Sequence, residues 1–122
     1  MGRPVKYTAL AALAVLATSF SMAPQIASAA GTATAKEGKA VAVNRKKGNC
    51  LACHQMGDGV SPGDLGPPLV AMKARFPDEA KLRAQIADPR TANPNTRMPP
   101  FGAYHILSGS EVDAIVTYLY TL

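Results

Sequence analysis

The sequence contains few of the residues that several functional classes require. It has no tryptophan, only two histidines and only two cysteines, which lie three residues apart, and aromatic residues make up 6% of its 122 positions. A disulfide framework needs more cysteines than this, and a structural zinc site needs four ligands. The basic residues form no long run and few aromatic residues accompany them, so nucleic-acid binding is not expected.

The sequence also lacks an apolar run long enough for a membrane span. Residues 8–20 are mostly apolar but are interrupted by Ser and Thr, and a spanning helix needs about 20 apolar residues. Two basic residues precede this run and Ala27-Ser28-Ala29 follows it, which is typical of a secretory signal peptide. We predict a cleaved signal peptide over residues 1–29, a periplasmic mature domain over residues 30–122, and no membrane span in that domain. An uncleaved N-terminal anchor is the alternative.

Charge is modest once the leader is removed. Two of the thirteen Lys and Arg residues lie in it, so the net charge falls from +5 to +3. The most basic stretch that remains is Arg45-Lys46-Lys47. We interpret it as a solvated helix end, with a docking site for an acidic partner as the alternative, because clustered charge steers encounter.

Apolar spacing predicts an all-α domain with long loops, no strands and no repeats. The expected helices cover residues 36–47, 69–75 and 77–87, and a last one starts at Ser108. Loops rich in Gly and Pro are expected over residues 57–68 and 89–102, and disorder over residues 30–35.

Individual residues refine these helices. In the first, Ala40 and Val41 are expected to face the core, and the last turn is expected to be basic and to end at Gly48. Pro77 is expected at the first helical position of the third, with Leu82 and Ile86 on its inner face. Ser108-Gly109-Ser110-Glu111 fits a capping box at the start of the last helix, whose buried face repeats at helical spacing.

The motif that carries chemistry is Cys50-Leu51-Ala52-Cys53-His54, the Cys-x-x-Cys-His sequence of haem c attachment. On a helical turn, residues three and four apart lie on one face. Cys50 and Cys53 therefore point the same way and can bind the two vinyl groups of one porphyrin, while His54 reaches the iron. The motif predicts one covalently attached haem c.

Other interpretations of the cysteine pair fit less well. A thioredoxin-like pair is expected near a βαβ pattern, which is absent. A zinc site lacks a second pair of ligands. A disulfide would close a very short loop and constrain the unfolded chain weakly. The histidine directly after the second cysteine favours haem.

A second iron ligand is expected on the other face of the haem. We predict that it is Met98, because the prolines of Arg97-Met98-Pro99-Pro100-Phe101 restrict the chain and hold the sulfur in place. His105 is the alternative, Met56 is too close to the motif to cross the haem, and Met72 is expected in the core. A Met/His pair raises the reduction potential and closes both axial positions, as electron transfer requires.

Together with this motif, Gly66-Pro67-Pro68-Leu69 gives residues 30–122 a resemblance to the class I cytochromes c, whose Gly-Pro-x-Leu segment it matches. The resemblance implies helices and long loops wrapped around one haem, with the first and last helices crossing near one haem edge. It also implies that the Pro67 carbonyl accepts a hydrogen bond from His54, which fixes the tautomer of the ring, and that Leu69 packs on the haem.

A longer combination of segments resembles the SoxX family, the small monohaem subunits of sulfur-oxidising SoxAX complexes. These segments are residues 46–54, 66–69, 93–102 and 115–122. The resemblance implies a heterodimer with SoxA and transient contacts with SoxYZ and a downstream cytochrome c. SoxAX is an L-cysteine S-thiosulfotransferase that joins thiosulfate to a cysteine of SoxYZ. The sulfur chemistry is placed on SoxA, so this chain would accept electrons and hold no catalytic residue.

Two other functions stay open from the residues alone. A free-standing small electron carrier would have the same haem site, and a haem-based gas sensor would need an open sixth position. Tyr118 and Tyr120 are expected to pack within the last helix, with a subunit interface as the alternative. The apolar surface around Phe101 is a second candidate for that interface.

Overall fold

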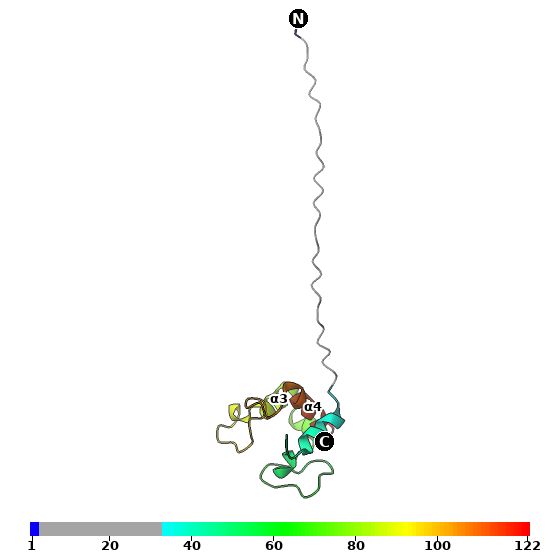
Figure 1. Cartoon of the computed structure of the whole chain (residues 1–122), viewed down its shortest axis with the longest axis vertical. Coiled ribbons are helices and arrows are strands. Elements are labelled where there is room, and N and C mark those ends of the chain that lie inside the picture. The colour runs from blue at the N-terminus through cyan, green and yellow to red at the C-terminus, as the bar shows by residue number, and fades with distance from the viewer. Residues whose placement is uncertain (3–32) are drawn as a thin grey trace.

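The computed structural model describes residues 1–2 and 33–122, and residues 33–122 form helices joined by long loops (Figure 1). The elements are α1 (Ala35–Val43), the 3-10 helix η1 (Cys50–Ala52), α2 (Met72–Arg75), α3 (Glu79–Ala87), the 3-10 helix η2 (Pro89–Thr91) and α4 (Gly109–Leu119). The described residues contain no strand, only an isolated bridge between Met56 and Leu69. The all-α prediction is confirmed.

The predicted signal peptide, residues 1–29, lies outside the described residues except for Met1 and Gly2. Among the helices that the structure describes, none combines the length and the apolar character that a membrane crossing requires.

The last helix, α4, is the centre of the fold. The Ser108 side chain accepts the Glu111 N–H, and the Glu111 carboxylate accepts the Ser108 N–H, so the predicted capping box is confirmed. One face of α4 is buried; it includes Val112, Ile115, Val116 and Leu119. Both α1 and α3 pack against α4, and the carbonyl of the C-terminal Leu122 accepts the Met72 N–H at the start of α2 (Figure 1).

The first helix differs from its prediction at both ends. Thr34 caps it in a second capping box with Glu37, so the disorder predicted for residues 30–35 is wrong at Thr34 and Ala35. The helix ends at Val43 rather than near residue 47, because the Asn44 side chain accepts the Lys46 N–H and turns the chain. The basic residues predicted for its last turn lie in this turn instead.

The buried face of α1 also differs from its prediction. Ala40 is exposed and Val41 is half-buried, whereas Gly38 and Ala42 are buried. This orientation requires a glycine at position 38, because a Cβ atom there would lie 1.9 Å from the carbonyl oxygen of Ala114 in α4. The two helix backbones therefore approach each other most closely at a residue with no side chain.

We expect Gly38→Ala to destabilise the protein strongly. The added Cβ meets backbone atoms of α4, which cannot move aside as a side chain could, so the helices must separate. Overpacking of this kind costs about 1–3 kcal/mol. Thermal unfolding followed by circular dichroism measures the loss. Lys36→Ala, on the exposed face of the same helix, is the control; an equal change in both variants would contradict the close helix contact.

Two further helices begin later than predicted. Ala71 has a φ of +50° and interrupts the second, so α2 begins at Met72 rather than at residue 69. Asp78, not Pro77, precedes the first turn of α3 and accepts the N–H groups of Ala80 and Lys81.

The inner face of α3 matches its prediction. Leu82 and Ile86 are both buried, so their assignment to the core is confirmed. Pro89 ends the helix as expected, but it opens η2 instead of an irregular loop.

Lys47 pairs with Glu111 and so links the turn before the haem motif to the start of α4. The Lys47 ammonium, and then the Ser108 backbone N–H, hold the pKa of Glu111 below its ordinary value of 4.5. A carboxyl group whose pKa is lower in the folded state stabilises the fold above its unfolded pKa, and this stabilisation is lost as the pH falls through the folded pKa.

Glu111→Gln keeps a capping side chain and removes the charge. We expect it to lower the free energy of unfolding near neutral pH by up to about 1 kcal/mol, because the pair is partly exposed. The difference from wild type should vanish at a pH below the Glu111 pKa. Thermal melts across this pH range measure the effect, with Asp64→Asn on an exposed loop as the control. A difference that persists at low pH would contradict the ionic origin.

Candidate haem-binding site

A cavity of about 580 Å³ opens between η1, the loop before α2, the inner face of α3 and α4. This volume lies within the range of about 300–1,000 Å³ that cofactor pockets occupy. All six residues that the sequence assigned to the haem line it: Cys50, Cys53, His54, Pro67, Leu69 and Met98. The fold thus gathers segments from both halves of the domain around one space.

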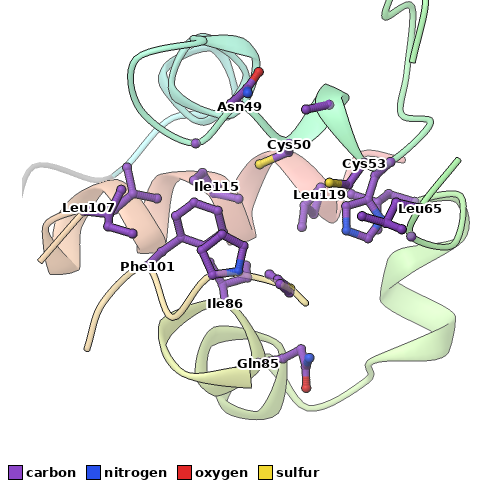
Figure 2. Close-up of a pocket in the computed structure, with 18 of the residues that line it drawn as sticks. Asn49, Cys50, Cys53, Leu65, Gln85, Ile86, Phe101, Leu107, Ile115 and Leu119 are labelled. Carbon is purple, nitrogen blue, oxygen red and sulfur yellow. The ribbon is translucent and has the colours of Figure 1, made fainter. Parts of the chain in front are cut away.

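The two cysteines lie on one side of this cavity. Their 3-10 turn is closed by the Cys53 N–H and the His54 N–H, which both donate to the Cys50 carbonyl at 3.1 and 2.9 Å. Figure 2 shows both sulfur atoms on the side of η1 that faces Phe101 and Ile86. Both thiols are free. The turn therefore presents two sulfur atoms and a histidine to the same apolar space.

The ionisation of Cys50 argues against a redox-active cysteine pair. Burial raises the pKa of the Cys50 thiol to about 11, so this thiol is protonated at neutral pH. A thioredoxin-like nucleophile needs a thiolate, and hence a lowered pKa. The apolar wall that disfavours the thiolate favours a neutral thiol or a thioether.

The ring of His54 is held by the loop that follows it. Its Nδ1 lies 2.7 Å from the carbonyl oxygen of Pro67, and because a carbonyl only accepts, Nδ1 carries the proton. The lone pair of Nε2 is then free to bind a metal, and this atom has no hydrogen-bond partner among residues 33–122. Gly66 allows the approach, since a Cβ there would lie 2.3–2.8 Å from three ring atoms.

The structure distinguishes the candidate second ligands by whether they line the cavity. Met98 lines the cavity and its N–H donates to Thr96 Oγ1 at 3.1 Å. His105, the alternative ligand, is exposed and does not line the cavity. Met56 is buried outside the cavity. Met72 is buried as expected but also borders the cavity, which the sequence did not indicate.

Much of the cavity wall was not identified from the sequence as part of the site. It is apolar and comes mainly from α3, α4 and the segment between them; among its members are Leu82, Ile86, Phe101, Leu107, Ile115 and Leu119. Helical spacing had marked several of them as core. The core face of α4 and the site wall are the same surface, which a periodic pattern alone does not reveal.

The aromatic residues considered for an interface pack inside the domain. Phe101 itself is buried and lines the cavity, whereas Tyr104 and Ile106 close to it in the chain are exposed, so an interface in this region stays a prediction that Phe101 does not contribute to directly. Tyr118 is buried, and the Tyr120 hydroxyl donates to the Phe76 carbonyl at 2.7 Å. Both tyrosines therefore pack within the domain, as their primary interpretation expected.

The charge around the cavity has one sign. Its basic lining residues are Arg45, Lys46, Lys47, Arg75 and Arg97, and none of its lining residues in the described part of the chain is acidic. Such a rim suits a ligand that is apolar in its body and carries carboxylates at one edge. A haem has this chemistry, and the two thiols and the free Nε2 complete the fit.

Comparisons with known proteins agree with this geometry. The family described as cytochrome C oxidase, cbb3-type, subunit III, matches residues 33–119. An uncharacterized lipoprotein of Aquifex aeolicus (strain VF5) is 35% identical over 77 residues, which cover 62% of this chain and 37% of that protein. The chain thus spans little more than a third of the length of this relative.

A solved structure is similar over most of the described residues. It is a chain from the crystal structure of SoxXA from P. pantotrophus, with a TM-score of 0.65 and 29% sequence identity. The match covers 72% of this chain and 80% of that chain.

Proposed function

This chain belongs to the cytochrome c family described as cytochrome C oxidase, cbb3-type, subunit III, and we propose that within it the chain serves as the electron-accepting subunit of a SoxAX complex. It is a c-type cytochrome electron carrier, and its Cys50 and Cys53 pair is consistent with covalent haem c. The similarity to SoxXA from P. pantotrophus carries the finer assignment, because it extends over 80% of that chain.

The cavity supports a proposed role for each of the residues named from the sequence. Cys50 and Cys53 form the thioethers, and His54 binds the iron through Nε2, with its ring orientation fixed by the Pro67 carbonyl. Met98 is the second ligand, from the segment that borders the same cavity. When bound, the haem supplies one-electron chemistry by cycling between its ferric and ferrous states.

The polypeptide around the haem restricts the chemistry to electron transfer. His54 and Met98 both line the cavity and would hold the iron between them, which would leave no open position on it for oxygen or small substrates. Cys50 and Cys53 are used in thioethers, which leaves no thiol to carry a sulfur atom. Sulfur chemistry therefore belongs on the partner, SoxA, and no catalytic residue is assigned here.

The location and the partners complete the proposal. Export to the periplasm is supported by the signal-peptide pattern of residues 1–29 and by the relative described as a lipoprotein. There the chain would form a heterodimer with SoxA, which receives thiosulfate and transfers it to SoxYZ. Electrons would leave to a downstream cytochrome c.

Native mass spectrometry of the protein purified from its own periplasm tests this proposal. A complex of this chain, carrying one haem, with a larger haem-bearing chain would support the SoxAX assignment. A lone chain with one haem would overturn that assignment and leave the alternative, a free-standing electron carrier.

A further inference from the structure

The segment that carries Met98 is a loop closed at its base. It runs from Asp88 to Tyr104, and two N–H groups near its end, those of Gly102 and Ala103, donate to the Ala87 carbonyl at 2.9 and 3.0 Å. This carbonyl is the last of α3, so the return of the chain is tied to the end of that helix.

No hydrogen bond in the described part of the chain ties the tip of this loop to the rest of the domain. Every hydrogen bond that the structure describes for residues 91–100 has its partner within the same 88–104 loop. Met98 itself is bound by its N–H to Thr96, two residues away. The position of the Met98 sulfur therefore depends on local turns, on packing against the cavity and on how firmly the base is closed.

A charged network joins the two ends of the loop. Arg90 donates from Nε and Nη2 to the two carboxylate oxygens of Asp88, both at 2.8 Å, and from Nη1 to the Tyr104 hydroxyl at 2.9 Å. Its guanidinium carbon also lies 4.8 Å from the centre of the Tyr104 ring. Asp88 in turn accepts the Arg90 N–H and so caps η2.

We propose that this Asp88–Arg90–Tyr104 network positions Met98 for the iron by holding the base of its loop closed. The inference rests on the proposed role of Met98 as a ligand. A guanidinium that binds a carboxylate with two parallel hydrogen bonds has a fixed plane, so it also fixes where Tyr104 lies. Because Arg90 and Tyr104 are fourteen residues apart with Met98 between them, separation at the base loosens the tip.

The network remains ionised at ordinary pH. The Arg90 guanidinium lowers the pKa of the Asp88 carboxyl, and Asp88 raises the pKa of Arg90. The Asp88–Arg90 pair is partly exposed to solvent, so it acts as a geometric constraint more than as a large source of stability.

Competition by imidazole for the iron of the ferric holoprotein tests this role, because imidazole binds only when Met98 leaves. We expect Arg90→Gln to tighten the apparent imidazole affinity by about threefold to tenfold, since it removes three charge-assisted hydrogen bonds at partly exposed sites. Tyr104→Phe removes a single hydroxyl and should give a smaller increase. Arg90→Lys keeps the charge without the paired geometry, so it should tighten imidazole binding by less than Arg90→Gln does.

Arg83→Gln is the matched control. It breaks an exposed ion pair with Asp113 between α3 and α4, outside the 88–104 loop, and should leave the imidazole affinity unchanged. Equal affinities for the Arg90, Tyr104 and Arg83 variants would overturn the positioning role while leaving Met98 as the ligand. If Arg90→Gln does not load haem, the Tyr104→Phe measurement decides alone. Absence of a sulfur-to-iron charge-transfer band in the wild type would overturn both the network and the Met98 assignment.

Discussion

Replacement of Met98 by alanine is expected to abolish the sulfur-to-iron charge-transfer band of the oxidised protein. Met98 is the methionine of the predicted ligand loop and it borders the cavity that holds both cysteines and His54. The reduction potential should fall by on the order of 0.1 V or more, because thioether ligation favours the ferrous state and axial ligands set haem potentials over about 0.8 V. Visible spectroscopy and a redox titration measure both effects.

His105→Ala is the control for this experiment. His105 is exposed and outside the cavity, so its removal should leave the band and the potential at their wild-type values. If the band survives in Met98→Ala and disappears in His105→Ala, the ligand assignment is wrong and the loop must adopt another arrangement when haem is bound.

Replacement of both Cys50 and Cys53 by alanine is expected to have the second large effect. No haem should then remain on the chain after denaturation, as measured by intact mass. The fold should also lose most of its thermal stability, because an apolar cavity of about 580 Å³ occupies the centre of a small domain and a loosely held ligand fills it less reliably.

Single variants and a neutral change separate attachment from folding. Cys50→Ala and Cys53→Ala each leave one sulfur atom for a thioether and should retain haem in part. Gln55→Ala changes an exposed residue directly after the motif that does not line the cavity, and should behave as wild type. Full haem retention on the denatured double variant would contradict covalent attachment through these residues.

The sequence was sufficient for the elements with local signals. The haem motif, the capping box before α4 and the inner face of α3 are each set by residues close together in the chain, and a single pattern indicates each of them. The six site residues were named from motifs and now lie around one cavity. Their ligand roles remain predictions that the variants above test.

The features that the sequence did not reveal depend on distant contacts. The orientation of α1 follows from the contact of Gly38 with Ala114, and no periodicity within α1 indicates that a glycine, not Ala40, faces the core. The same holds for the base of the Met98 loop, where Arg90 meets Tyr104. Such pairs require the folded chain.

The helix ends differ from their predicted positions because single local interactions, which the apolar spacing does not register, set them. Asn44 and Ala71 stop or delay a helix through one side-chain hydrogen bond or one left-handed residue. Alanine favours helix in isolation, so its propensity does not indicate the left-handed φ at Ala71. The core positions were affected much less than these boundaries.

Carbon monoxide titration of the reduced holoprotein tests the central claim most directly, since that claim is an electron carrier whose iron has no open position. With His54 and Met98 both bound, we expect carbon monoxide to bind slowly and weakly, limited by the departure of Met98. Fast, tight binding would show an open sixth position, and the chain would then be a gas-binding haem protein rather than an electron relay.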